Sequence, residues 1–182
     1  MTRAPVAHRF LQLGDFYFGS ERLRVQTVLG TCIAITLWHP IKRLGGICHY
    51  LLPTRGIARA PASGLPGVYA DDVMELFEAS MRRSQTRAQE YQVKLFGGGN
   101  MFPEQLATSK CRDQACTDRA RATCASIGCR NIAAGQQMLA EHGFTLAARD
   151  VGGHGSRQVS FDVWSGDVWV RRGAAVSDGV PA

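Results

Sequence analysis

One cysteine and one histidine lie on two segments that the sequence predicts to be neighbouring strands. Residues Cys32–Trp38 alternate large apolar with smaller side chains, and Gly45–Leu52 form a second strand-like run. Pro40 favours a turn between the two segments, because proline has no N–H to donate to a strand ladder. If the hairpin turns directly after Pro40, Cys32 lies opposite His49 with Cβ atoms about 4.5–5.5 Å apart. A slip of one residue would place the two side chains on opposite faces.

A thiol and an imidazole at that separation have the chemistry for nucleophilic attack on an amide. His49 would take the Cys32 proton, and the thiolate would attack a carboxamide carbon. Backbone N–H groups near Gly30 would stabilise the oxyanion, and His49 would protonate the departing ammonia before water cleaves the thioester. A third group should hold the imidazole in the useful tautomer, and the nearest hydroxyls are those of Thr27, Thr31 and Thr36.

Cys48 is the neighbour of His49 in sequence, but a strand directs successive side chains to opposite faces. We therefore expect Cys32 to be the nucleophile and Cys48 to be a core residue. The pair by itself does not distinguish an active site from a chance pairing, since many cores hold one cysteine and one histidine on adjacent strands.

The remaining pattern predicts a mixed α+β domain. Asp71–Arg83 has the three-four apolar spacing of a helix with one buried face. A second helix is expected from an Asn131 cap to Gly143. Strands outnumber helices and several are joined by short turns, including a C-terminal hairpin around Ser165–Asp167. The expected architecture is therefore layered, with largely antiparallel or mixed sheets flanked by helices.

Five segments of the chain resemble the CheD family and occur in family order between residues 14 and 172. Two of them hold the candidate pair: Leu-Gly-Thr-Cys-Ile at 29–33 and Gly-Gly-Ile-Cys-His-Tyr-Leu-Leu-Pro at 45–53. The other three are Lys-Leu-Phe-Gly-Gly-Gly-Asn-Met at 94–101, Ile-Gly-Cys-Arg-Asn at 127–131, and Asp-Val-Gly-Gly-His-Gly-Ser-Arg at 150–157 followed by Phe-Asp at 161–162.

The resemblance implies a protein-glutamine glutaminase that converts glutamines of methyl-accepting chemoreceptors to glutamate and ammonia, with no cofactor. It implies Cys32 as nucleophile and His49 as general base and acid. It also implies a threonine shortly before the cysteine that orients the histidine, and we assign that role to Thr27. The implied fold is akin to bacterial cysteine-dependent toxin deamidases. The implied partners are the cytoplasmic domain of the receptor and, in some bacteria, the CheC phosphatase.

Composition leaves two other function classes to weigh. The net charge of +6 and the pI near 9.3 would suit a nucleic-acid binder, but the arginines are dispersed among acidic and small residues. A basic surface equally suits an acidic protein partner. The second alternative keeps the CheD-like fold as a docking module without catalysis. We find no membrane span and no secretory signal, and therefore expect a cytoplasmic protein with reduced cysteines.

We expect one domain over residues 1–182, with a core at 14–172, a cysteine-rich insert at 102–130 and a flexible tail at 173–182. Four thiolates in the insert could hold zinc, although their spacing is wider than the usual Cys-x2-Cys pairs. We expect reduced thiols and no metal there. The residues concerned are Cys111, Cys116, Cys124 and Cys129.

Overall fold

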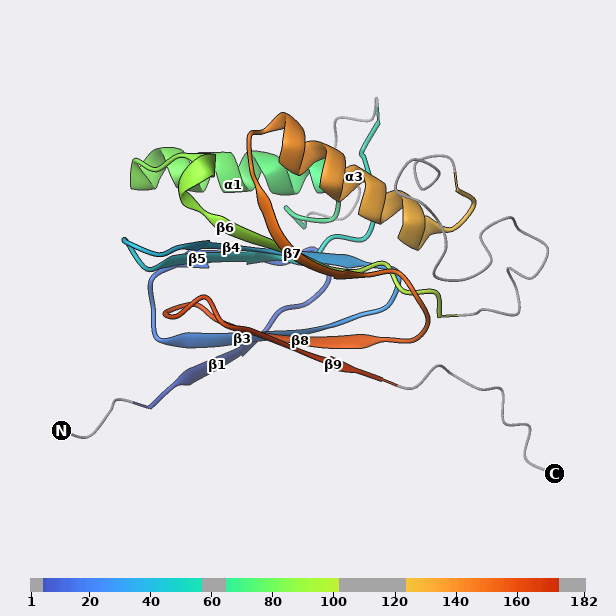
Figure 1. Ribbon diagram of the computed structural model, residues 1–182, viewed down its shortest axis with the longest axis horizontal. Coiled ribbons are helices and arrows are strands. Elements are labelled where there is room, and N and C mark those ends of the chain that lie inside the picture. The colour runs from blue at the N-terminus through green and yellow to red at the C-terminus, as the bar shows by residue number, and fades with distance from the viewer. Residues whose placement is uncertain (1–4, 57–64, 102–123, 174–182) are drawn as a thin grey trace.

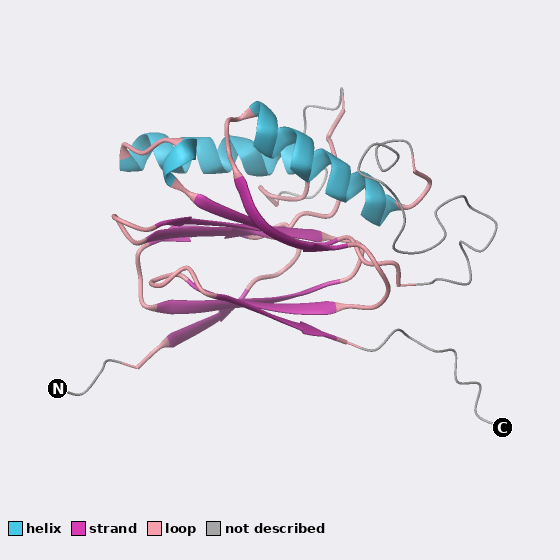
Figure 2. Ribbon diagram, in the orientation of Figure 1, coloured by secondary structure: helices cyan, strands magenta, loops and turns pink. Residues whose placement is uncertain are grey.

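The protein has three layers in a computed structural model that describes residues 5–56, 65–101 and 124–173. Within these described residues, two helices cover one side of a five-stranded sheet, and a four-stranded sheet packs against its other side (Figure 1). Both helices lie on the same outer side of the molecule (Figure 2). The predicted class, a layered α+β fold with mixed sheets, is confirmed. The helices flank only one of the two sheets.

The sheets combine segments from both halves of the chain. The elements are β1 Ala7–Phe10, β2 Phe16–Gly19, β3 Leu23–Leu29, β4 Ile33–His39, β5 Leu44–Cys48, α1 Ala70–Ser84, the 3-10 turn η1 Ala88–Glu90, β6 Gln92–Gly97, α3 Ile127–Glu141, β7 Leu146–Val151, β8 Arg157–Asp162 and β9 Val168–Arg172. The small sheet has the order β1-β3-β8-β9 and the large sheet β2-β5-β4-β6-β7. The pairs β1–β3 and β6–β7 are parallel, and the other neighbouring pairs are antiparallel.

Helix α1 forms where the apolar spacing predicts it. Its buried face includes Val73 and Phe77, while acidic residues occupy the first turn and arginines the last. Both placements favour the helix dipole. The helix ends at Gln85, which adopts a left-handed conformation with φ of 51°.

Helix α3 begins earlier than the sequence predicts. Ser126 is its N-cap and Ile127 its first residue, so the prediction that Asn131 caps this helix is wrong. The Asn131 side chain instead donates to carbonyls of distant segments. The other end is close to the prediction, because Gly143, with φ of 76°, follows the C-cap residue His142.

Two apolar interiors result from this stacking. One lies between the helices and the large sheet and contains alternate residues of β4, namely Ile33, Ile35 and Leu37. The other lies between the two sheets, where Ala34 and Phe96 of the large sheet meet Leu29 and Val159 of the small one. The polar side chains that could do chemistry face this second interior. Among the described residues, no helix is long and apolar enough to cross a membrane.

Candidate active site

Cys32 lies in a tightly held turn immediately before β4. It is half-buried and packs against the apolar cluster between the sheets. The glycine run after β6 approaches its backbone directly: Gly98 N–H donates to the Cys32 carbonyl at 2.8 Å, and Gly99 N–H donates to the Gly30 carbonyl at 2.8 Å. Gly97 has φ of 111°, and a Cβ there would collide with the Cys32 carbonyl. The glycine run therefore turns the backbone directly against Cys32.

A second glycine turn supports the first. Gly152 N–H donates to the Gly97 carbonyl at 2.9 Å, and Asn100 N–H donates to the Gly153 carbonyl at 2.8 Å. Arg157 is 2% exposed, donates to Asp150 at 2.8 Å and also donates to the Gly152 carbonyl. Arg157 therefore fixes this turn.

Asp162, on the same strand as Arg157, pairs with a different arginine. Asp162 lies at the far end of β8 and accepts two hydrogen bonds from Arg24, at 2.6 and 2.8 Å. Those two residues are directly opposite in the β3–β8 ladder.

His49 is held from both sides in the inter-sheet space. Its side chain is nearly buried, and its backbone pairs with the loop before β2 through Gly14 and Asp15. Its Nδ1 lies 2.8 Å from the Thr27 hydroxyl of β3, and the same hydroxyl donates to the Leu11 carbonyl at 2.9 Å. Thr27 belongs to β3 of the small sheet and His49 directly follows β5 of the large sheet, so this hydrogen bond joins the two sheets.

These contacts determine the imidazole tautomer. The Thr27 hydroxyl has one proton, and the Leu11 carbonyl can only accept it. His49 Nδ1 must therefore carry the proton of its own hydrogen bond and donate it to Thr27. In a neutral ring this leaves the lone pair on Nε2, which is buried and has no hydrogen-bond partner among the described residues. A base in this state is ready to accept a proton.

The predicted register of the β4–β5 hairpin is wrong by two residues. Leu37 pairs with Gly46 rather than Leu44, and Ile33 pairs with Tyr50. The turn is a four-residue one, Pro40–Arg43, in which Arg43 adopts φ of 50°. The centre of the hairpin consequently lies one residue later than expected.

The shift changes how Cys32 and His49 are related but keeps them on one side. Extending the register places Leu51 opposite Cys32 and Ala34 opposite His49. The candidate pair is therefore diagonal, with a Cα separation of about 7–8 Å for such neighbours, rather than directly opposed. Because a shift of two residues preserves the alternation of side chains, both still face the small sheet.

Cys48 lies on the opposite face, as the alternation predicts. It is fully buried in the interior under the helices, where its Sγ accepts the Ile35 N–H at 3.4 Å. Burial raises the pKa of this thiol to about 12. Cys48 is therefore a protonated core residue at neutral pH.

Burial also sets the resting charge of the candidate pair. Desolvation raises the pKa of Cys32, and a hydrogen bond from the Thr31 side chain opposes that rise. Desolvation lowers the pKa of His49 from its ordinary value of 6.5, against the opposing effects of the Leu11 carbonyl and the Asp15 charge. At neutral pH the Cys32 thiol and the His49 imidazole are therefore both neutral.

The family model of CheD chemotactic sensory transduction matches residues 51–172 of this chain. The chain belongs to the CheD family. A relative from Dechloromonas aromatica, named "Probable chemoreceptor glutamine deamidase CheD 3", is 45% identical over 93% of this chain and 91% of its own. A relative from Pseudomonas savastanoi pv. phaseolicola, named "Probable chemoreceptor glutamine deamidase CheD", is 38% identical over 93% of this chain and 87% of its own. Cys32 and His49 precede the family-model match but fall within the span of these relatives.

The solved structures give a weaker likeness. The Bacillus licheniformis hypothetical protein YfiH overlaps 75% of this chain and 50% of its own, with 13% sequence identity and a TM-score of 0.43. A likeness at this level carries no argument about the CheD-family chain.

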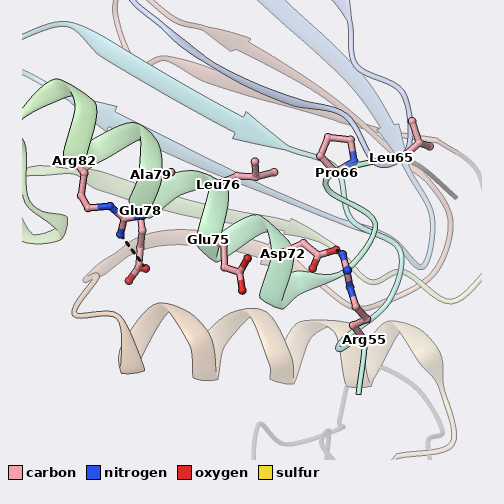
Figure 3. A pocket seen from close by; sticks show the side chains of 9 residues that line it. All are labelled: Arg55, Leu65, Pro66, Asp72, Glu75, Leu76, Glu78, Ala79 and Arg82. Carbon is pink, nitrogen blue, oxygen red and sulfur yellow. Dashed lines mark hydrogen bonds and ion pairs between the residues drawn. The ribbon is translucent and has the colours of Figure 1, made fainter. Parts of the chain in front are cut away.

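A pocket elsewhere on the molecule is separate from this pair. It has a volume of about 600 Å³ and lies on the outer side of α1, where Asp72, Glu75 and Glu78 alternate with arginine and apolar side chains (Figure 3). Its basic side chains are already engaged, since Arg55 pairs with Asp72 and Arg82 with Glu78. The described residues that line it include no cysteine, histidine or hydroxyl side chain, and Cys32 and His49 face the other side of the large sheet.

The expected cysteine-rich insert falls mostly on residues 102–123, and the expected tail mostly on 174–182, which lie outside the described residues. Cys111 and Cys116 are among them. Cys124 is half-buried, and Cys129 is buried in the first turn of α3. No group of three metal-ligating side chains occurs among the residues that are described.

One residue of the site was missed from the sequence. Asn131 of α3 is fully buried, and its side chain donates to the main-chain carbonyls of Thr31 and Leu51. Thr31 directly precedes Cys32, and Leu51 lies two residues after His49. The place of Asn131 within the Ile-Gly-Cys-Arg-Asn segment was visible, but the cap interpretation hid its role. The contacts span 100 and 80 residues of sequence, so no local pattern indicates them.

Proposed function

We propose that this chain is a chemoreceptor glutamine deamidase in which Cys32 is the nucleophile, His49 the general base and acid, and Thr27 the residue that orients His49. The curated relatives, which match nearly the whole chain, are named for this activity. The observation that carries the residue roles is the chain of hydrogen bonds from His49 Nδ1 to Thr27 and on to the Leu11 carbonyl. It leaves Nε2 as a free base on the side of the sheet that Cys32 also faces.

The first half of the reaction forms a thioester. His49 Nε2 takes the thiol proton as Cys32 Sγ attacks the side-chain carbonyl carbon of a substrate glutamine. The carbonyl π electrons move to oxygen, and backbone N–H groups of the turn stabilise the resulting oxyanion. When the tetrahedral intermediate collapses, the carbon–nitrogen bond breaks and the proton on His49 passes to the departing nitrogen, which leaves as ammonia.

The second half restores the enzyme. His49 takes a proton from water, and the hydroxide attacks the thioester carbon. The carbon–sulfur bond then breaks, and the thiolate regains its proton from His49. The side chain leaves as the carboxylic acid, which gives its proton to the released ammonia, so the sum is one glutamine and one water converted to one glutamate and one ammonium ion.

The diagonal placement of Cys32 and His49 suits this sequence. A directly opposed pair would hold the thiol against the imidazole, whereas a diagonal pair leaves space between them for the carboxamide. Catalytic hydrogen bonds are often long in the absence of substrate and shorten in the complex. The unpartnered Nε2 is consistent with a base that meets its proton only when substrate is bound.

The alternative is a docking module that binds receptor without chemistry. It gives no reason for a buried imidazole to have its tautomer set by Thr27 and Leu11 while Nε2 stays unpaired, since a buried polar atom without a partner costs free energy. The enzyme is therefore the better-supported proposal.

The test is the intact mass of a chemoreceptor cytoplasmic fragment from the same organism after incubation with the protein. Each deamidated glutamine adds about one dalton, and Cys32→Ala should abolish that gain while the circular dichroism spectrum is retained. No mass gain with folded wild-type protein would favour the docking module. A gain that persists with Cys32→Ala would instead reject the nucleophile assignment.

Two further parts of the proposal concern the surroundings. The receptor glutamines lie on its cytoplasmic domain, so we place the protein in the cytoplasm. The family resemblance also implies the CheC phosphatase as a second partner, which would compete with the receptor for the same surface. Addition of CheC to the deamidation assay should then raise the apparent KM for the receptor fragment.

A further inference from the structure

Asn131 is a polar side chain in a fully buried position, where an unpaired polar group destabilises the fold. It lies five residues into α3 and is 0% exposed. The amide nitrogen donates to the Thr31 carbonyl at 3.0 Å and to the Leu51 carbonyl at 2.7 Å. Both of its protons are therefore used to bridge two segments that lie on either side of the candidate active site.

The orientation of the amide is set by these partners. Asn131 Oδ1 is buried and has no hydrogen-bond partner among the described residues. Exchanging oxygen and nitrogen would direct that oxygen at two carbonyl oxygens, which would repel it. The donors, and not the acceptor, therefore explain why an asparagine stands here.

The Thr31 carbonyl is the middle one of three that are each held. The Gly30 and Cys32 carbonyls accept backbone N–H groups from Gly99 and Gly98, each at 2.8 Å. The Thr31 carbonyl accepts the Asn131 side chain. Asn131 is thus the side chain that completes the fixing of the nucleophile turn.

Fixing this carbonyl also fixes the N–H that follows it. In a trans peptide the C=O and N–H groups point in opposite directions, so the Cys32 N–H is directed away from Asn131. It donates to no other residue in the described part of the chain. It does lie close to its own Sγ, where it opposes the raised pKa of the thiol. An N–H beside the attacking sulfur is well placed to meet the oxyanion that forms on the attacked carbon.

We propose that Asn131 is a positioning residue for deamidation: by holding the Thr31 and Leu51 carbonyls, it aims the Cys32 N–H at the substrate oxyanion and keeps the turn in register with the His49 strand. This inference rests on the proposed function. It assigns to Asn131 no contact with substrate.

The test compares two reactions of Cys32, only one of which needs an oxyanion to be stabilised. Deamidation forms an oxyanion, whereas alkylation by iodoacetamide does not. Asn131→Ala should lower kcat for the receptor fragment by at least about tenfold with little change in KM, since one oxyanion donor contributes about 100- to 1000-fold and is misplaced rather than removed. The alkylation rate of Cys32 should change by less than about threefold.

Two further variants separate positioning from stability. Asn131→Asp keeps the volume, and burial should keep the new carboxyl protonated with one donor, so its kcat should lie between those of the wild type and Asn131→Ala. Tyr50→Phe is the matched control. The Tyr50 hydroxyl donates to the Asn131 main-chain carbonyl at 2.6 Å, so this variant removes a buried hydrogen bond to the same residue but leaves the side-chain bridge. It should lower the melting temperature while retaining kcat within about twofold.

Each result has a distinct meaning. Wild-type kcat in folded Asn131→Ala or Asn131→Asp would overturn the inference. So would a parallel loss of deamidation and alkylation, or an equal loss of kcat in Tyr50→Phe. Wild-type protein that is alkylated at Cys32 but releases no ammonia from the receptor fragment would overturn the proposed function itself, and the inference with it.

Discussion

The Thr27 hydroxyl is the most direct point at which to perturb this site. Thr27→Val replaces the hydroxyl by a methyl group of nearly the same size in a fully buried position. It removes two hydrogen bonds at once, the one to the Leu11 carbonyl at 2.9 Å and the one to His49 Nδ1 at 2.8 Å. The imidazole then loses its reason to keep the proton on Nδ1, and Nε2 is no longer held as the free base.

The expected loss follows from the charge on His49 during the reaction. When Nε2 takes the thiol proton the ring becomes a cation, and its hydrogen bond to Thr27 becomes charge-assisted. Such bonds contribute about 1.5–3 kcal/mol. With about 1.4 kcal/mol for each factor of ten, kcat should fall roughly 10- to 150-fold. The free energy of unfolding should also fall, because the Leu11 carbonyl and the Nδ1–H each lose a buried partner at about 1–3 kcal/mol apiece.

The assay is the initial rate of ammonia release from receptor fragment, with the melting temperature measured on the same preparations. Thr27→Ser retains the hydroxyl and should recover most of the lost kcat. Thr36→Val is the matched control. Thr36 is 2% exposed and lies between two residues of the helix-side interior, so it faces the small sheet as Thr27 faces the large one. It should keep kcat within about twofold.

One result would refute this reasoning. If Thr27→Val is folded and retains wild-type kcat, the His49 tautomer does not depend on this hydroxyl. The orienting role would then pass to another group. A loss of equal size in Thr36→Val would show a general effect of buried threonine replacement instead.

The remaining predictions concern the core thiol, the pH profile and the glycine turn. Cys48→Ala should keep kcat but lower the free energy of unfolding by about 1 kcal/mol through the cavity that it leaves; an inactive, folded variant would contradict the geometry. Because burial lowers the pKa of His49 below its ordinary value of 6.5, the acid limb of the kcat/KM profile should be centred below pH 6.5; a limb centred above 6.5 would be inconsistent with a buried base. The same shift has a stability consequence: the unfolded state binds the proton first, so stability present above about pH 6.5 should be lost as the pH falls through the unfolded value, and His49→Gln should flatten that part of a melting-temperature profile. Gly97→Ala should reduce both kcat and melting temperature, since its Cβ would displace the Cys32 carbonyl at a φ of 111°, and unchanged values would show that the turn adapts.

Local patterns in the sequence were sufficient for helix α1 and for strands β4 and β5, including the face on which their side chains lie. The alternation in β4 and β5 separated Cys48 from His49 without any knowledge of the tertiary structure, because a strand has a period of two residues. The same pattern did not determine how the strands pair. The pairing depended on the four-residue turn Pro40–Arg43, in which Arg43 adopts a left-handed conformation. Because this conformation is uncommon for a non-glycine residue, the sequence does not predict it.

Two strands and one residue role required the assembled fold. β1 is exposed at all four positions, so its side chains show no buried face from which to predict it. β2 is a short aromatic run, and it forms a strand by pairing with β5, which comes later in the chain. Asparagine is a residue type that often caps helices. Only the packing of α3 close to Thr31 and Leu51 shows that the Asn131 side chain has another function.

The sequence by itself determined that this chain holds a cysteine and a histidine in CheD-family segments, and that Cys48 and His49 point to opposite faces. Only the tertiary structure decided that Cys32 and His49 are diagonal and that Thr27, on the other sheet, holds the imidazole proton. The physical reason is one of range. Side-chain alternation is a property of a few consecutive residues, whereas a hydrogen bond between His49 and Thr27 exists only after the two sheets have packed together.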